Sequence, residues 1–309
     1  MLRGHGGAGI RTQEPLRVPA LKAGAFGRSA TPPPDGGSTP AVKCLPLCGP
    51  NTFCRGPVNP PAMELLVVGA GAMGRWLGRA LREDGPPSLD LSVLDTDPDA
   101  AREAADALDA DVVDPDTDET FEAVCFAVPI PVAAEAIATY GGQAERAVFD
   151  VMGTMAEPVT AMRRHAPNRE RVTLHPLFAP ENEPGNVPVV ADAPGPATDR
   201  VRDALAARGN DLFETTPGEH DEAMETVQAR AHAAVLAYAL AAAEVPEGFQ
   251  TPVSAGLGDL ATQVAGGDAG VYADVQAAFD GADDVAAAAR RVADADREEF
   301  EHLYDEAGE

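Results

Sequence analysis

The stretch Leu65-Leu-Val-Val-Gly69-Ala-Gly71-Ala-Met-Gly74 decides how this chain is expected to fold. Its four leading apolar residues predict a buried parallel strand, and residues 72–84 follow with the apolar spacing of a helix. Between the two, Gly69 permits a tight turn, Gly71 lets a pyrophosphate approach the backbone, and Gly74 lets the helix pack closely. Since a helix N-terminus attracts negative charge, the turn predicts a dinucleotide-binding site.

A second strand leads to the residue that would select the cofactor. Residues 89–94 form this strand, and Asp95 follows the glycine motif by about 20 residues, where a ribose-binding acid is expected. Its carboxylate would accept hydrogen bonds from the adenosine ribose and repel a 2′-phosphate. The next residues, Thr96 and Asp97, add no arginine to hold that phosphate. We therefore predict NAD rather than NADP, with Met73 also among the cofactor-binding residues.

Strands and helices alternate as far as residue 215 and predict a doubly wound parallel sheet of Rossmann type. Short apolar runs mark further strands at residues 111–113, 123–128, 147–151, 172–174, 187–190 and 212–215. Helices are expected at residues 98–108, 156–165 and 197–208, and another is opened by Pro129 and Pro131. This alternation is typical of parallel strands that are joined by crossing helices.

A second domain is expected after residue 215. Thr216-Pro-Gly-Glu219 has the spacing of a capping box, and it opens an Ala-rich helix over residues 219–244. Residues 251–306 are typical of three more helices without strands. The long helix carries an apolar stripe that should pack into a domain core or a dimer interface. We therefore predict a cofactor domain at residues 63–215 and a helical substrate and dimerisation domain at residues 216–309.

The sign of the net charge changes near residue 63, where the alternation of strands and helices begins. Residues 1–62 carry seven basic and two acidic side chains, whereas residues 63–309 hold 48 acidic and 16 basic side chains and no lysine. The first segment is rich in Gly and Pro and has no period, so we expect a disordered extension or a misassigned start. The acidic remainder would repel itself at low ionic strength. We therefore expect a halophilic, cytoplasmic protein that binds no nucleic acid.

Neither a metal site nor a membrane segment is expected. Cys44, Cys48 and Cys54 match no standard zinc spacing and have no histidine beside them. Cys125 stands alone in an apolar run, where a cysteine is usually a small hydrophobic residue. No run approaches the roughly 18 apolar residues that span a membrane, and no secretory signal is visible.

Two further segments place chemistry beside the glycine loop. Cys125-Phe-Ala-Val128-Pro129 ends a predicted strand, so Val128 and Pro129 should flank the nicotinamide, although a proline that only starts a helix is an equally good interpretation. His175 ends another predicted strand at the same edge of the sheet. A histidine there can exchange a proton with a substrate hydroxyl near neutral pH. Because most single histidines are structural or solvated, its position alone leaves both interpretations open.

Several short motifs follow one another along the chain. Their order is Gly-x-Gly-x-Met-Gly, Ala-Val-Pro, Asp-Val-x-x-x-x-x-x-Pro-Val, His-Pro-x-Phe-x-Pro and His-Asp, the last at residues 220–221. This order resembles the prephenate dehydrogenase family. Val227-Gln-Ala-Arg-Ala-His232, Thr251-Pro252 and Tyr272-Ala-Asp-Val-Gln276 resemble segments of its helical domain. The resemblance covers nearly all of residues 63–309, and the acidity suggests an archaeal halophile version.

The resemblance implies oxidative decarboxylation of prephenate to 4-hydroxyphenylpyruvate in tyrosine biosynthesis, with NAD as the cofactor. The family's catalytic histidine falls on His175, which would accept the proton of the ring hydroxyl as hydride leaves that carbon. Loss of CO2 then aromatises the ring. The enzyme would therefore mainly orient the donor carbon and assist the proton.

The chain departs from the family pattern at two places. Where the family often has Ser and Lys after the Asp, Gly153 and Met155 stand here, so only Thr154 offers a hydroxyl. The family's substrate-carboxylate arginine falls on Gln263, and a neutral amide does not replace a guanidinium. Arg230 is an alternative source of that charge, although a solvated arginine is an equally good interpretation. Arogenate, which has an amine where prephenate has a keto group, therefore stays open as the substrate.

Other functions also stay open. Another two-domain reductase, such as a pyrroline-carboxylate reductase, shares the glycine motif and a helical dimer domain but does not require the His-Pro-x-Phe segment. The β-hydroxyacid dehydrogenases rely on a helical-domain lysine that this chain lacks. A non-catalytic sensor would bind NAD without turnover. The Ala-rich helical domain is expected to mediate a homodimer, with the active site in the cleft between the domains.

Overall fold

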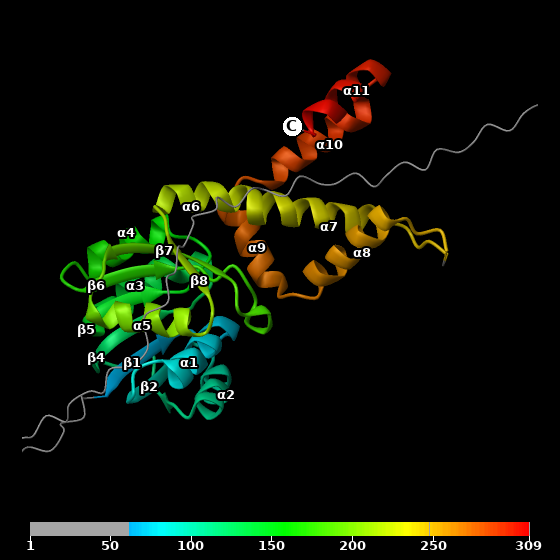
Figure 1. Cartoon of the computed structure of the whole chain (residues 1–309). Coiled ribbons are helices and arrows are strands. Elements are labelled where there is room, and N and C mark those ends of the chain that lie inside the picture. Colours follow the sequence, from blue (N-terminus) through cyan, green and yellow to red (C-terminus); the bar gives the residue numbers. More distant parts are fainter. Residues whose placement is uncertain (1–61, 247, 309) are drawn as a thin grey trace, which may run out of the picture. The chain divides into compact units, whose positions relative to one another are not determined.

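The computed structural model describes residues 62–246 and 248–308, and within them eight strands form one sheet (Figure 1). The sheet order is β3-β2-β1-β4-β5-β6-β7-β8. The strands are β1 (Met63–Val68), β2 (Leu89–Leu94), β3 (Asp111–Val112), β4 (Phe121–Phe126), β5 (Ala144–Asp150), β6 (Glu170–Leu174), β7 (Asn186–Ala193) and β8 (Asp211–Glu214). The sheet is of the Rossmann type, the fold class that the sequence predicts. The expectations for the N-terminal segment, with Cys44, Cys48 and Cys54, lie outside the described residues.

The sheet departs from the expected all-parallel arrangement at β7, which runs antiparallel to β6. A parallel neighbour needs a crossover connection, which is usually a helix. Residues 175–185 join β6 to β7 and contain one short 3-10 turn, Pro180–Asn182, so the chain turns back directly. After α5 (Pro196–Ala207), β8 again runs parallel to β7.

Helices cover both faces of the sheet because alternate strand residues point to opposite sides. Leu65 and Val67 of β1 belong to one buried cluster, while Leu66 and Val68 belong to another. The helices of the first cluster are α1 (Ala72–Asp84), α2 (Pro98–Leu108) and α5, and those of the second are α3 (Ala133–Tyr140) and α4 (Ala156–His165). The expected double winding is thus present, with its core on both faces.

The C-terminal part begins where the capping box predicts. The Thr216 hydroxyl accepts a hydrogen bond from the Glu219 backbone N–H at 3.2 Å, and the Glu219 carboxylate accepts one from the Thr216 N–H at 3.1 Å. A continuous helix follows, made of α6 (Pro217–Met224), a π-helical segment (Glu225–Arg230) and α7 (Ala231–Ala241). The π-helical segment is not visible in the sequence pattern.

Four helices occupy residues 248–308, where the sequence predicts three. They are α8 (Pro252–Ala265), α9 (Ala269–Ala278), α10 (Ala282–Asp294) and α11 (Arg297–Glu306). The additional starts have local causes, since the Asp268 and Asp296 side chains cap α9 and α11. None of the helices in the described chain is both long and apolar enough to cross a membrane.

These helices bury few of their side chains. Described residues of α7, α8, α10 and α11 include no buried side chain, although α7 is almost entirely apolar. By contrast, α9 buries Val275 in a small cluster with Met224, Ala229 and Phe279. That cluster ties α9 to the π-helical segment and α6.

Candidate active site

The glycine loop between β1 and α1 consists of backbone that side chains would obstruct. Gly69 has a φ of +107°, and a Cβ there would lie 2.2 Å from the Ala127 carbonyl oxygen. A Cβ on Gly74 would lie 2.1 Å from the Gly69 carbonyl oxygen. By contrast, a Cβ on Gly71 would meet no atom within 4 Å. The outer glycines therefore fix the turn, and the middle glycine borders open space.

The N-terminus of α1 offers backbone donors to that space. Gly71 is the N-cap, and no side chain caps this helix end. The Arg75 N–H makes the first helical hydrogen bond, to the Gly71 carbonyl at 3.1 Å. The preceding N–H groups therefore have no acceptor within the helix, and such an end suits a phosphate group.

Asp95 lies half-buried after β2, next to the glycine loop. Its Oδ2 accepts a hydrogen bond from the Ala70 N–H at 2.7 Å, and its Oδ1 accepts one from the Asp97 N–H at 2.9 Å. Each carboxylate oxygen has a further lone pair that a ribose hydroxyl could use. The carboxylate thus holds the loop and keeps acceptor capacity for a ligand.

The other expected cofactor residues lie around the same loop. Val128 is half-buried, and its Cγ1 is 3.2 Å from the position that a Gly69 Cβ would take. Pro129 is exposed and precedes the 3-10 turn Ile130–Val132, while Met73 packs against the core. The open space at Gly71, the uncapped helix end and the ribose acceptor together fit a dinucleotide.

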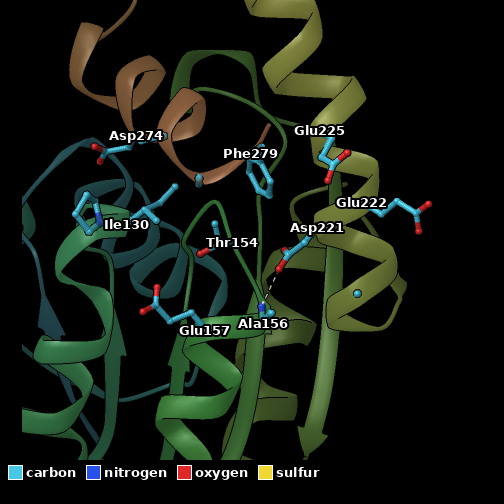
Figure 2. A pocket seen from close by; sticks show the side chains of 13 residues that line it. Ile130, Thr154, Ala156, Glu157, Asp221, Glu222, Glu225, Asp274 and Phe279 are labelled. Atoms are coloured by element: carbon cyan, nitrogen blue, oxygen red, sulfur yellow. Dashed lines mark hydrogen bonds between the residues drawn. The ribbon is translucent and has the colours of Figure 1, made fainter. Parts of the chain in front are cut away.

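Three side chains form a hydrogen-bonded chain between the end of β6 and α6. His175 Nδ1 lies 2.9 Å from His220 Nε2, and His220 Nδ1 lies 2.8 Å from Asp221 Oδ1. Asp221 also accepts a hydrogen bond from the Met155 backbone N–H at 3.0 Å and one from the Ala156 backbone N–H at 3.1 Å, the second of which is drawn in Figure 2. Both imidazoles are buried, with exposed fractions of 7% for His175 and 2% for His220.

Burial and hydrogen bonds set the charges of His175 and Asp221, the two ends of this hydrogen-bonded chain. Burial lowers the pKa of His175 to about 3, the neighbouring His220 acts in the same direction, and Asp221 opposes both. Near pH 7 His175 is therefore neutral, and one of its ring nitrogens carries no hydrogen. Burial alone would raise the pKa of Asp221, but hydrogen bonds from His220, Met155 and Ala156 bring that pKa below its ordinary value. Asp221 is therefore a carboxylate.

Gln228 and the loop that carries Thr154 lie near His175, and both residues have polar atoms without a partner in the described chain. Thr154 follows β5 and is 7% exposed, and its hydroxyl has no hydrogen-bond partner among the described residues. Gln228, in the π-helical segment, places its Nε2 at 3.4 Å from His175 Nε2, and its Oε1 also lacks a partner in this part of the chain. A Cβ on Gly153 would lie 3.8 Å from His175 Nε2. His175 Nε2 thus faces the loop that carries Thr154.

A cavity of about 710 Å³ opens beside these groups, and Thr154 lines it (Figure 2). Its other walls come from α4, from α6 with the π-helical segment, and from α9 with Phe279. The lining includes five carboxylates and no basic side chain from the described chain: Glu157, Asp221, Glu222, Glu225 and Asp274. Within that part of the chain, no group of three or more acidic, His or Cys side chains could hold a metal ion.

The two expected substrate-carboxylate residues lie outside the cavity lining. Arg230 donates to Asp284 at 2.9 and 2.7 Å and to Glu225 at 3.2 Å, so its guanidinium is engaged in ion pairs. Gln263 is exposed on α8. His232 is half-buried, with its ring edge-on to Tyr272 at a centroid distance of 4.7 Å.

Sequence reasoning missed three residues of this arrangement. The sequence pattern marks His220 and Asp221 only as the last of the ordered motifs, without a role in the site. It assigns no role to Gln228. The adjacent His-Asp pair directly after a capping box was the available signal. The contact itself joins residues 45 positions apart, which no local pattern reports.

Known proteins resemble this chain in sequence and in fold. No family model matches the chain. A 4-amino-4-deoxyprephenate dehydrogenase of Streptomyces pristinaespiralis is 30% identical over 235 residues, which cover 71% of this chain and 78% of that protein.

Two solved structures share the fold at lower identity. Prephenate dehydrogenase from Aquifex aeolicus, in complex with hydroxyphenyl propionate and NAD+, aligns with a TM-score of 0.60 at 19% identity, over 79% of this chain and 96% of that one. A putative prephenate dehydrogenase from Corynebacterium glutamicum aligns with a TM-score of 0.55 at 17% identity, over 79% and 86%. At these identities the similarity concerns the fold.

Proposed function

Because the chain belongs to the prephenate dehydrogenase family, we propose that this dehydrogenase catalyses the NAD-dependent oxidative decarboxylation of prephenate to 4-hydroxyphenylpyruvate. The observation that carries the proposal is the buried His175 imidazole, whose Nε2 faces the Gly153–Thr154 loop, together with a Thr154 hydroxyl that has no partner within the described chain. Parallel strands β1, β5 and β6 end at one edge of the sheet, so Gly69, Thr154 and His175 follow strands at that edge. Ligands of open α/β sheets bind at this edge.

NAD suits the glycine loop, where Gly71 borders open space and Asp95 retains acceptor capacity for the ribose. The carboxylate of Asp95 would also repel the 2′-phosphate of NADP. When bound, NAD supplies the acceptor for the hydride that leaves the substrate ring. The protein's own part in the reaction is to orient the ring and manage one proton.

His175 is the residue proposed to manage that proton. As the ring carbon is oxidised to a carbonyl, its hydroxyl loses a proton, which His175 Nε2 accepts. Loss of CO2 then leaves an electron pair in the ring, which becomes aromatic and bears a phenolate oxygen. His175 returns the proton to this oxygen, so CO2 leaves and no net proton is released. The Thr154 hydroxyl would hydrogen-bond the same oxygen.

A second candidate substrate class carries an amine. The five carboxylates of the cavity would attract an ammonium group, and the described part of the lining offers no basic side chain to a dicarboxylate such as prephenate. Arogenate carries its amine on the side chain. The relative from Streptomyces pristinaespiralis is named for 4-amino-4-deoxyprephenate, which has an amine in place of the ring hydroxyl.

A spectrophotometric assay separates these candidates. NADH formation is followed at 340 nm in molar KCl with prephenate, arogenate or 4-amino-4-deoxyprephenate, each with NAD and with NADP. Turnover of prephenate with NAD supports the first proposal, and turnover of an amine substrate alone supports the second. No turnover in a sample that binds NAD would reject both in favour of a sensor or another reductase.

The role of His175 is tested by replacing it. His175→Asn should lower kcat by about 10²- to 10⁴-fold, the usual contribution of general acid–base catalysis, while NAD affinity stays within about twofold. The matched control is His302→Asn, which changes an exposed histidine of α11 and should leave kcat unchanged. Full activity of His175→Asn would remove His175 from the mechanism.

We also propose that residues 216–309 form a substrate and dimerisation domain separate from residues 63–215, and that a second copy covers its helices. Leu240 is 88% exposed and Val253 is 73% exposed, on helices whose described residues include no buried side chain. Apolar helix faces of this extent are typical of subunit interfaces. Light scattering in molar salt should give twice the chain mass, and a concentration-independent monomer would contradict the dimer.

A further inference from the structure

The hydrogen-bonded chain from Asp221 to His175 has one consistent direction of donation. Backbone N–H groups donate to both Asp221 oxygens, so the carboxylate acts as an acceptor. His220 Nδ1, at 2.8 Å from Oδ1, must then carry a hydrogen. The opposite tautomer would point a nitrogen lone pair at a carboxylate.

The same logic continues to the catalytic ring. A neutral His220 with hydrogen on Nδ1 has its lone pair on Nε2, which lies 2.9 Å from His175 Nδ1. His175 therefore donates from Nδ1, and its own lone pair is on Nε2. That nitrogen faces the Gly153–Thr154 loop and the Gln228 amide.

Because His175 is buried, a positive charge on its imidazole needs a negative group nearby. A protonated His175 is costly in a site that excludes water, because charge is poorly solvated there. The proposed reaction nevertheless keeps the proton on His175 until CO2 has left. Asp221 is the ionised group at the far end of the chain, and its negative charge reaches His175 through His220.

We propose that His220 and Asp221 are positioning residues that hold His175 in its Nδ1–H tautomer and balance the charge of its imidazolium between proton uptake and return. This inference rests on the proposed dehydrogenase function. It assigns to α6 a part in the chemistry, whereas the base itself follows β6. Neither positioning residue needs to touch the reacting atoms.

The sharpest test is Asp221→Asn. The asparagine has a single amide oxygen for the two acceptor positions. With that oxygen at the Oδ2 position, where it accepts from the Ala156 N–H, the NH2 group takes the Oδ1 position, donates to His220 Nδ1 and leaves the Met155 N–H without its acceptor. Both imidazoles then reverse, and His175 Nε2 carries a hydrogen and no longer accepts a proton. By analogy with the same change in a Ser-His-Asp triad, kcat should fall by up to about 10⁴-fold. KM and NAD affinity should stay within about threefold.

Two variants of His220 distinguish a positioning role from a merely structural one. His220→Gln keeps an acceptor for the His175 Nδ1–H but does not relay charge, so it should lose less kcat than His220→Leu, which removes the acceptor. Asp106→Asn changes an exposed carboxylate on α2 and should leave kcat unchanged. Equal kcat in His220→Gln and His220→Leu would overturn the tautomer argument.

Nitrogen NMR gives a readout that does not require turnover. In protein labelled with ¹⁵N-histidine, the His175 signals, assigned with His175→Asn, should show hydrogen on Nδ1 in the wild type and on Nε2 in Asp221→Asn. Hydrogen on Nε2 in the wild type would refute the inference even if the variant fails to fold. If no substrate is turned over but the tautomers behave as expected, the proposed function fails and the control of the His175 tautomer by Asp221 and His220 stands.

Discussion

Asp150 ends β5 with a carboxyl group that is fully buried, and replacing it with asparagine should change how stability depends on pH. Burial raises the pKa of Asp150 to about 8, and the Met152 N–H and the nearby Thr173 hydroxyl only partly oppose that rise. In the unfolded chain the same group has a pKa of about 3.9. Between these values the folded state holds a proton that the unfolded state has lost.

The sign and size of the effect follow from this difference. The contribution of Asp150 to stability is fully present below a pH of about 3.9 and is lost as pH rises toward 8. Each pH unit in this window costs about 1.36 kcal/mol, so about 4 kcal/mol is lost between pH 5 and pH 8. An asparagine side chain at this position would not titrate. The free energy of unfolding of Asp150→Asn minus that of the wild type should therefore rise by about 4 kcal/mol over this range.

Urea denaturation in molar KCl measures this difference. Trp76, the single tryptophan of the chain, is 3% exposed and reports by its fluorescence on the packing of α1 against the sheet. Asp106→Asn is the control, since its carboxylate is exposed and its stability curve should parallel that of the wild type. Parallel curves for Asp150→Asn and the wild type would refute the reasoning, because Asp150 would then be ionised in the folded protein.

Four other predictions concern the glycine loop, the cofactor and the salt requirement. Gly71→Ala should fold with an unchanged Tm but bind NAD at least about tenfold more weakly by calorimetry, because its Cβ enters open space where a phosphate would lie. Gly74→Ala should lower both the Tm and the affinity, since its Cβ would overlap the Gly69 carbonyl, and an unchanged Tm would contradict that geometry. Asp95→Ala should lower the ratio of kcat/KM for NAD over NADP by about tenfold or more, because the group that repels a 2′-phosphate is gone; an unchanged ratio would remove Asp95 from cofactor selection. Transfer from molar to 0.1 M KCl should unfold the wild type, as seen by far-UV circular dichroism, because residues 63–309 carry 48 acidic and 16 basic side chains; retained structure would contradict the halophilic interpretation.

Local signals predicted the first half of the sheet well. The expected helices at residues 72–84 and 98–108 agree with α1 and α2 to the residue. Their starts depend on nearby groups, namely Gly71 for α1 and, for α2, the Asp97 side chain that accepts from the Asp99 N–H at 2.9 Å. Elements set by neighbours in the sequence are thus readable from the sequence.

Long-range pairing limited the prediction elsewhere. The reversal at β7 depends on strand pairing with β6, and apolar runs carry no information on direction. The contact of His175 with His220 spans 45 residues. Likewise, Arg230 is engaged by Asp284, which lies 54 residues later in α10. The position of His175 at the end of a strand was therefore predictable, whereas its hydrogen-bond partner and the ion pair of Arg230 required the fold.

The absence of buried side chains from α7, α8, α10 and α11 in the described chain has a consequence for assembly kinetics. Helices in water gain most of their stability from packing an apolar face, so these four gain little from folding alone. A second copy that covers them would order them and bind them in one step. Helix formation would then be second order in protein, and on dilution the helical signal of these four helices should fade while the sheet around Trp76 stays folded.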